Sequence, residues 1–310
     1  MKSFTDICKM SQLEVKEYAK KFLASAKYSP VVDDGFVYAK GDVPVLLVAH
    51  MDTVHKQLCT DIVNEKGKIS SPQGIGGDDR CGIFMIMNIV KELHCSVLFC
   101  EDEEIGGVGA NKFVKSFISD NVDVNYIIEF DRKGNNDAVF YNCDNKEFED
   151  FVCDNTGLKK SFGTFSDISI LAPALKTAAV NVSCGYYNAH TVSEYVVYDE
   201  MMDIIECAKN LIKTESEKFI YIAKSYNYNA VSEYNSDWFD RNYGQTSLFS
   251  SKVLQHIKED REVELEVIYT DDGKEKVGYG YGMTKADAWF DFFVSYPEAS
   301  MSMVEDYSIN

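Results

Sequence analysis

Apolar and polar positions alternate along the first two thirds of the chain in a way that predicts strands separated by helices. Short apolar runs predict buried strands at 43–49, 96–100, 124–130 and 177–182. Longer segments with helical spacing predict helices at 82–93, 107–118 and 199–217. The alternation predicts an α/β fold, with a mostly parallel mixed sheet flanked by helices.

The pattern changes after the last of these helices, and this change divides the chain into three predicted parts. Residues 1–217 hold the sheet and its helices, and residues 218–250, rich in Tyr, Asn and Ser, predict a linker or irregular region. Residues 251–310 predict a small α+β module. This module begins with a hairpin that turns at DDGK and continues in a helix that Thr284 caps and that stops before Pro297.

The charge balance excludes two classes of partner. The chain has 31 Lys and Arg against 50 Asp and Glu, which gives a formal net charge of -19. A protein this acidic repels phosphate backbones and anionic membrane surfaces. We therefore expect no nucleic-acid partner and no membrane partner.

The cysteines and the first residues of the chain indicate in which cellular compartment the protein lies. Nine cysteines are scattered between Cys8 and Cys207 without a CxxC pair. This pattern is typical of reduced thiols, since disulfide-rich scaffolds are usually short and secreted. The opening MKSFTDICKM lacks the apolar segment of a secretory signal peptide. The apolar runs elsewhere are too short to span a membrane. The sequence thus predicts a cytoplasmic protein.

Histidines and acidic residues gather directly after the predicted strands. They lie in five segments: AHMDTVH (49–55), GIGGDDRCG (74–82), EDEEIGG (101–107), EFDRKG (129–134) and YYNAHTVSEYV (186–196). Strand ends form the crevice where open α/β sheets bind ligands. Two imidazoles and at least three carboxylates in one crevice indicate a metal site, and mixed nitrogen and oxygen ligands favour zinc. Three carboxylates and one hydroxide would balance two divalent ions, most simply two Zn²⁺.

These five segments, in this order, resemble the co-catalytic zinc exopeptidase superfamily. That superfamily includes leucyl aminopeptidases, peptidase T, glutamate carboxypeptidase and acetylornithine deacetylase. The resemblance covers roughly residues 43–213, and it implies a zinc exopeptidase-like catalytic domain within 1–217.

The resemblance implies five metal ligands: His50, Asp78, Glu104, Asp131 and His190. Asp78 would bridge the two ions. His50 and Asp131 would share one ion, and Glu104 and His190 would share the other.

Two further residues receive a catalytic role from the resemblance. Asp52 would support the imidazole of His50, because a carboxylate behind a ligating histidine fixes its tautomer and raises its basicity. Glu103 would be the general base, next to the ligand Glu104. Asp79 is left with a structural role, and Glu101 and Asp102 are interpreted as capping or solvated acids.

One further segment pair extends the resemblance, while His55 and the missing lid stand apart from it. The segments GTFSDISIL and GYYNAHTVSEYV are similar to a peptidase T pattern, and this makes Asp167 a candidate substrate-binding residue that orients groups at the site or meets a substrate amine. His55 is expected in a surface turn with a structural role. The intervals between Asp131 and His190, and between Asp52 and Asp78, are too short for the family's usual lid domain.

The resulting hypothesis is metal-dependent hydrolysis of an amide bond in short peptides by a bridging zinc hydroxide, with Glu103 as base. An aminopeptidase or dipeptidase is favoured; an N-acyl amino-acid deacylase and a non-catalytic metal-binding scaffold are the alternatives. The substrate is then a short peptide or an acyl amino acid, and a homo-oligomer is compatible with the sequence. The aromatic-rich residues 226–243 are predicted to pack near the crevice mouth or at a subunit interface.

Overall fold

The computed structural model describes residues 1–224, 263–271, 274–282 and 304–309. The chain divides into two compact units, Met1–Ser225 and Tyr226–Asn310. Each unit is described by itself below.

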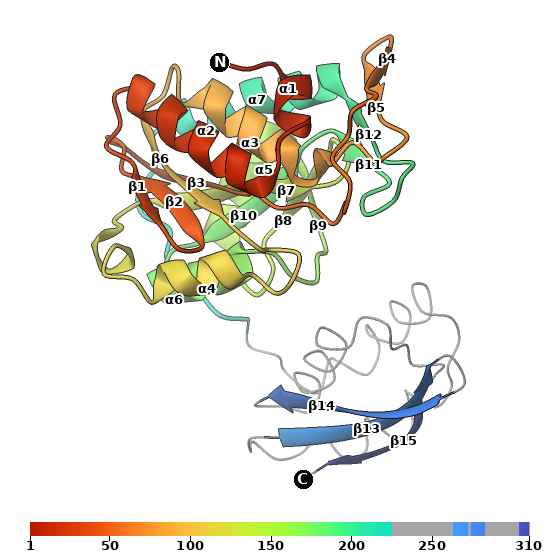
Figure 1. The fold of residues 1–310 in the computed structure, drawn as a ribbon. Coiled ribbons are helices and arrows are strands. Elements are labelled where there is room, and N and C mark those ends of the chain that lie inside the picture. Colours follow the sequence, from red (N-terminus) through yellow and green to blue (C-terminus); the bar gives the residue numbers. More distant parts are fainter. Residues whose placement is uncertain (225–262, 272–273, 283–303, 310) are drawn as a thin grey trace. The chain divides into compact units, whose positions relative to one another are not determined.

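The first unit is built on a sheet of eight strands in the order β1-β2-β6-β3-β7-β10-β8-β9 (Figure 1). The strands are β1 (Val31–Asp33), β2 (Phe36–Ala39), β3 (Val43–His50), β6 (Cys95–Cys100), β7 (Tyr126–Arg132), β8 (Asp137–Val139), β9 (Lys159–Ser161) and β10 (Ala179–Ser183). The central strands β6, β3, β7 and β10 are parallel to one another. This confirms the predicted mixed, mostly parallel sheet, and the four predicted strands are its four central ones.

Helices cover both faces of this sheet (Figure 1). One face carries α1 (Phe4–Cys8), α2 (Gln12–Ser25), α3 (Gly77–Ile89), α5 (Lys146–Thr156) and α7 (Tyr198–Lys213). The other carries α4 (Val108–Val114) and α6 (Ile168–Leu175), with the short 3-10 helix η1 (Ser119–Asn121) after α4. Each face buries its own apolar cluster, as expected for a parallel sheet with helices on both sides.

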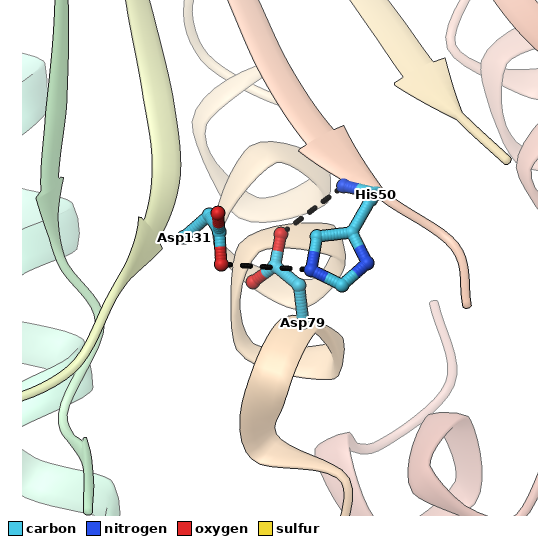
Figure 2. A group of neighbouring side chains, drawn as sticks. All are labelled: His50, Asp79 and Asp131. Atoms are coloured by element: carbon cyan, nitrogen blue, oxygen red, sulfur yellow. Dashed lines mark hydrogen bonds and ion pairs between the residues drawn. The ribbon is translucent and has the colours of Figure 1, made fainter. Parts of the chain in front are cut away.

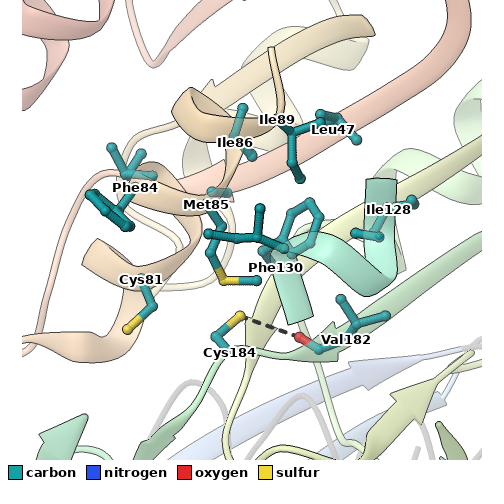
Figure 3. Packing of buried hydrophobic residues seen from close by; sticks show 14 of the residues in the cluster. Leu47, Cys81, Phe84, Met85, Ile86, Ile89, Ile128, Phe130, Val182 and Cys184 are labelled. Atoms are coloured by element: carbon teal, nitrogen blue, oxygen red, sulfur yellow. Dashed lines mark hydrogen bonds between the residues drawn. The ribbon is translucent and has the colours of Figure 1, made fainter. Parts of the chain in front are cut away.

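The helix α3 packs closely on β7 at the centre of the larger cluster (Figure 3). Met85, Ile86 and Ile89 are fully buried there together with Ile128 of β7. At Gly82 a Cβ atom would lie 2.1 Å from the carbonyl oxygen of Phe130. The absence of a side chain at this glycine therefore allows the start of α3 to approach the strand end.

A second, smaller antiparallel sheet holds the loop that contains His190. Its order is β11-β12-β5-β4, with β4 (Val63–Glu65), β5 (Lys68–Ser70), β11 (Tyr186–Tyr187) and β12 (Tyr195–Val197). The turn between β11 and β12 comprises residues 188–194. The sheet therefore fixes both ends of this turn.

The two sequence intervals in which the family's lid domain would be inserted form strands of these two sheets and two of the helices. Between Asp131 and His190 the chain forms β8, α5, β9, α6, β10 and β11, and between Asp52 and Asp78 it forms β4 and β5. All of them lie within the first compact unit.

The first unit continues past the predicted boundary at residue 217. Phe219 is buried against Phe148 and Phe151, and isolated bridges join Ile220 to Thr177 and Ala223 to Cys143. Residues 218–224 therefore pack on the first unit; the rest of the predicted linker, with the aromatic residues 226–243, lies outside the described residues.

The described part of the second unit is a three-stranded antiparallel sheet in the order β14-β13-β15. Its strands are β13 (Val263–Asp271), β14 (Lys274–Gly282) and β15 (Val304–Ile309). Asp271 pairs with Lys274, which confirms the predicted hairpin. The predicted helix from Thr284 lies outside the described residues. Across the described ranges, every helix is too short or too polar to cross a membrane.

Candidate metal centre

The predicted site residues follow strands that end at the same edge of the main sheet. β3 lies between β6 and β7, and all three run parallel. His50 is the last residue of β3, Asp131 is near the end of β7, and Glu103 follows β6. Parallel strands bring their carboxyl ends to one crevice, so residues far apart in the sequence meet here.

Asp78 lies between the two predicted histidine ligands. Its Oδ1 is 3.1 Å from Nε2 of His50, and its Oδ2 is 3.1 Å from Nε2 of His190. Nε2 of His50 is also 3.5 Å from Oδ1 of Asp131, and Nε2 of His190 is 3.1 Å from Oε1 of Glu104. One carboxylate thus presents a different oxygen to each of two similar ligand groups.

These separations fit ligands around metal ions. Zinc ligands lie about 2.0–2.2 Å from the ion in a near-tetrahedral arrangement, so two ligand atoms of one ion lie roughly 3.3–3.6 Å apart. The four contacts span 3.1–3.5 Å. In addition, Oε1 of Glu104 is buried without a hydrogen-bond partner of good geometry among the described residues. Two imidazoles and three carboxylates of this kind fit two divalent ions with a shared carboxylate.

Asp52 connects the two sides of the crevice. Its Oδ1 is 3.1 Å from Nδ1 of His50 and accepts a hydrogen bond from the backbone N–H of Glu103 at 3.0 Å. Its Oδ2 accepts one from the N–H of Glu104 at 3.1 Å. Burial opposes ionisation of Asp52, but the hydrogen bond and charge of His50, together with the backbone hydrogen bonds from Glu103 and Glu104, outweigh burial and lower its pKa to about 2. Asp52 therefore orients the imidazole and also holds the paired glutamates.

Burial and neighbouring carboxylates shift the ionisation of the acids in the crevice. Burial, then the charge of Asp78, raises the pKa of Asp131 to about 7. Burial, then the charge of Asp131, raises the pKa of Glu103 to about 11. For Asp78 the effect of burial is outweighed by hydrogen bonds with His190 and His50, so its pKa is lowered. The crevice thus concentrates negative charge that divalent cations would neutralise.

The neighbouring carboxylates raise the pKa values of both histidines. Burial disfavours the charged form of His50, but contacts with Asp131, Asp52 and Asp78 outweigh burial and raise its pKa well above the usual value. Contacts with the carboxylates of Asp78 and Glu104 raise the pKa of His190 to about 10. These pKa shifts reflect the carboxylate oxygens that face the Nε2 atom of each imidazole, an arrangement also found among ligands that share an ion.

Asp79 has a structural role, as the sequence analysis expected. Figure 2 shows its carboxylate directed at the backbone nitrogen of His50, while Asp131 faces the imidazole ring. Its Oδ2 accepts the N–H of His50 at 3.2 Å, and its Oδ1 accepts the N–H of Gly82 at 2.8 Å. Although Asp79 lies close enough to His50 and Asp131 to share an ion, both of its oxygens already hold backbone groups. Asp79 therefore joins the end of β3 to the start of α3.

The overall structure is similar to that of solved aminopeptidases. Aminopeptidase PepT from Bacillus cereus matches with a TM-score of 0.57 and 14% sequence identity, over 67% of this chain and 96% of that chain. A tripeptidase from Staphylococcus aureus gives a TM-score of 0.55 at 14% identity, over 68% and 96% of the two chains. An aminopeptidase from Desulfurococcus kamchatkensis gives 0.53 at 14% identity, over 69% and 95%. These likenesses show a shared fold. No protein-family model matches the sequence, and no curated protein matches it.

The four consecutive acids after β6 divide into two pairs. Glu101 forms an ion pair with Lys16 at 2.7 Å and accepts the N–H of Gly35. Asp102 accepts a hydrogen bond from the side chain of Gln12 at 3.0 Å. Since Gln12 and Lys16 are both in α2, this helix holds the first pair. Glu103 and Glu104 instead lie close to His50, in a group that could hold a metal ion.

Asp167 is buried inside the first unit rather than exposed on its surface. It precedes α6, is fully buried, and both of its carboxylate oxygens are without a hydrogen-bond partner of good geometry among the described residues. Burial raises its pKa to about 6, and the positive charge of His50 opposes this shift. Of the two roles suggested for Asp167, its burial favours orientation of the site over contact with a substrate amine.

Three buried polar residues near the site were not assigned a role from the sequence. Glu194 accepts hydrogen bonds from the N–H groups of Gly76 and Asp78. The guanidinium of Arg80 donates to the carbonyl oxygens of residues 10, 51 and 52. Glu129 accepts a hydrogen bond from Ser166. All three lie in the segments with the metal ligands, but no periodic pattern distinguishes them from solvated charges.

The interpretation of His55 needs a correction. We expected it in a surface turn, yet its side chain is only 10% exposed and its Nε2 lies 2.9 Å from the buried Glu194. The partner is 139 positions away in the sequence. Local sequence context therefore could not predict the contact.

Proposed function

We propose that this protein is a dinuclear metal-dependent hydrolase that cleaves an amide bond in short peptides, as an aminopeptidase or dipeptidase. The observation that carries the proposal is the position of Asp78, whose two oxygens each lie 3.1 Å from a different histidine nitrogen. Such a shared carboxylate is what two neighbouring metal positions require. The likeness in fold to an aminopeptidase and a tripeptidase supports a peptide as substrate.

In this proposal each ion has one ligand set. His50 and Asp131 would hold the first, His190 and Glu104 the second, and Asp78 both. Nitrogen and oxygen ligands in this combination favour Zn²⁺. Two such ions would lower the pKa of water and polarise the substrate carbonyl.

Side chains of the protein would transfer the proton during the reaction. Glu103 would accept a proton from the attacking water, whose oxygen bonds to the carbonyl carbon. Glu103 would then donate that proton to the amine as the C–N bond breaks. Asp52 holds the N–H of Glu103 and so keeps this carboxylate beside the ligands. The retained Glu103 favours an enzyme over a non-catalytic metal scaffold.

The nine cysteines are all free thiols. Free thiols suit a reducing compartment, and we assign the enzyme to the cytoplasm.

The deciding experiment is a substrate screen of the full chain loaded with Zn²⁺. Fluorogenic aminoacyl amides and dipeptides form one set, and N-acetyl amino acids form the other. We expect turnover of the first set and its loss after metal chelation. Turnover confined to the second set identifies a deacylase, and turnover of neither set by protein that binds two ions supports the scaffold.

A further inference from the structure

Glu194 is a buried acid in the turn between β11 and β12, four residues after His190. Its side chain is 0% exposed. Its Oε2 accepts a hydrogen bond from the N–H of Gly76 at 2.8 Å and lies 2.9 Å from Nε2 of His55. Its Oε1 accepts a hydrogen bond from the N–H of Asp78 at 3.1 Å. Because burial of a carboxylate is costly unless its oxygens are paired, these three donors stabilise it.

The backbone before α3 needs such an acceptor. Gly76 has a left-handed conformation, with φ 64°, and Asp78 has a non-helical ψ of 105°. The N-cap residue Gly76 has no side chain that could accept a hydrogen bond from the first turn of the helix. The first N–H groups of a helix also lack partners within the helix. Glu194 therefore satisfies two N–H groups that the local segment cannot satisfy.

The same turn also contacts the side chain of Asp78. Nε2 of His190 lies 3.1 Å from Oδ2 of Asp78, and Glu194 accepts the N–H of that residue. Asp78 is thus held at its backbone and at one carboxylate oxygen by residues of a single turn. Its other oxygen is left to face His50.

His55 holds Glu194 in turn. A carboxylate can only accept a hydrogen bond, so Nε2 of His55 is the donor. The imidazole packs on Gly74, where a Cβ atom would lie 2.2 Å from Cε1 of the ring. The glycine thereby leaves room for the ring, and the loop after β3 is joined to the turn after β11.

We propose that Glu194 and His55 are a pair of positioning residues for the bridging carboxylate Asp78. Neither contacts a metal position or the substrate. Through the N–H groups of Gly76 and Asp78, they set the rotation of the carboxylate so that its two oxygens face the two metal positions. This inference rests on the proposed dinuclear site.

The test is a Zn²⁺ titration of the metal-free full chain by calorimetry, comparing the wild type with Glu194→Gln. The amide keeps the size of the side chain but replaces one acceptor oxygen by an NH₂ group, which would face an N–H donor. We expect the weaker of the two binding steps to become about ten- to a hundredfold weaker, the usual effect of changing a residue behind a metal ligand. The thermal midpoint of the metal-free protein is measured alongside.

Two further variants keep the test decisive. His55→Phe removes the donor while a ring still fills the space beside Gly74, and we expect a weakening of about tenfold in the same step. It also serves if Glu194→Gln does not fold. Glu149→Gln is the matched control, because Glu149 is buried on α5 and pairs with Lys160. We expect it to bind both ions as the wild type does.

The outcomes separate this inference from the proposed function. If the wild type binds two ions and both variants bind them with unchanged affinity, the positioning role is wrong and the dinuclear site stands. A lowered thermal midpoint with unchanged Zn²⁺ affinity also overturns the inference, because it indicates a purely structural role. A wild type that binds fewer than two ions overturns the proposed function, and this inference with it.

Discussion

The two halves of the candidate metal centre are built from different kinds of structure. His50 ends a central strand and its side chain is 1% exposed, whereas His190 lies in a turn, has a φ of 65°, and its side chain is 54% exposed. Asp131, on the side of His50, has its N–H held by Asn181 in the neighbouring strand. The half built on the sheet is buried and supported on several sides.

In the proposed dinuclear site, this difference would make the two positions hold their ions unequally. A site on strand ends is preorganised by the hydrogen bonds of the sheet, while a site on loops depends on a few long-range contacts. We expect the position of His50 and Asp131 to bind the tighter ion. The position of His190 and Glu104 should exchange its ion more readily.

The largest expected effect comes from removing the residue that both halves share. Asp78→Ala would delete a proposed ligand of both ions, so we expect loss of tight metal binding and activity at background. Elemental analysis of the purified protein and the peptide assay measure the two effects. A variant that retained two tightly bound ions would show that Asp78 does not bridge them.

The next largest effect separates catalysis from metal binding. Glu103→Gln should retain both ions but lose about two to four orders of magnitude in kcat, the usual contribution of general acid-base catalysis. The matched control is Glu101→Gln on the same loop, since Glu101 pairs with Lys16 away from the crevice. Equal kcat values for the Glu103 variant and the wild type would remove the assigned role.

The two histidines test the comparison directly. His50→Ala leaves buried carboxylates without their partner, and we expect it to lower the free energy of unfolding of the metal-free protein by about 3 kcal/mol or more. His190→Ala should lower it by less than about 1 kcal/mol, because its side chain is half exposed. Chemical denaturation measures both.

Metal content completes this test. We expect the His190 variant to keep one tightly bound ion and the His50 variant to lose the tighter one. Equal stability loss and equal metal content in the two variants would contradict the difference between the halves.

The last expected effect is confined to stability and concerns the support from α2. Lys16→Met removes the ion pair with Glu101 at 2.7 Å while keeping the length of the side chain. We expect a loss of about 1 kcal/mol in the free energy of unfolding and unchanged metal binding. A change in Zn²⁺ affinity would mean that α2 contributes to the metal centre itself.

Much of the first unit could be predicted from the sequence because the apolar runs that form its central strands are local features. The apolar runs that became β3, β6, β7 and β10 are continuous, as expected for strands buried on both faces. The ends of such strands lie at one edge of a parallel sheet, so the positions of His50 and Asp131 followed without knowledge of their distances. The hairpin at Asp271 was likewise predicted from its turn residues.

The predicted domain boundary at residue 217 was less accurate. A boundary placed at a change in composition misses the contacts that the following residues make with the domain. Phe219 packs on aromatic residues from α5 and β7, and the first unit runs to Ser225. Burial of a single aromatic side chain outweighs the polar character of the surrounding sequence.

From the sequence alone came the four central strands, three of the helices beside them, the edge where the candidate ligands gather and the residue types found there, because these follow from local apolar runs and from the residues directly after them. The tertiary structure alone decided how the acids divide their roles. Asp79 accepts backbone N–H groups while its neighbour Asp78 faces two histidines. Glu194 reaches Asp78 across 116 positions and His55 across 139. Such contacts follow from the way loops close over the sheet, and no short-range pattern of residue types specifies them.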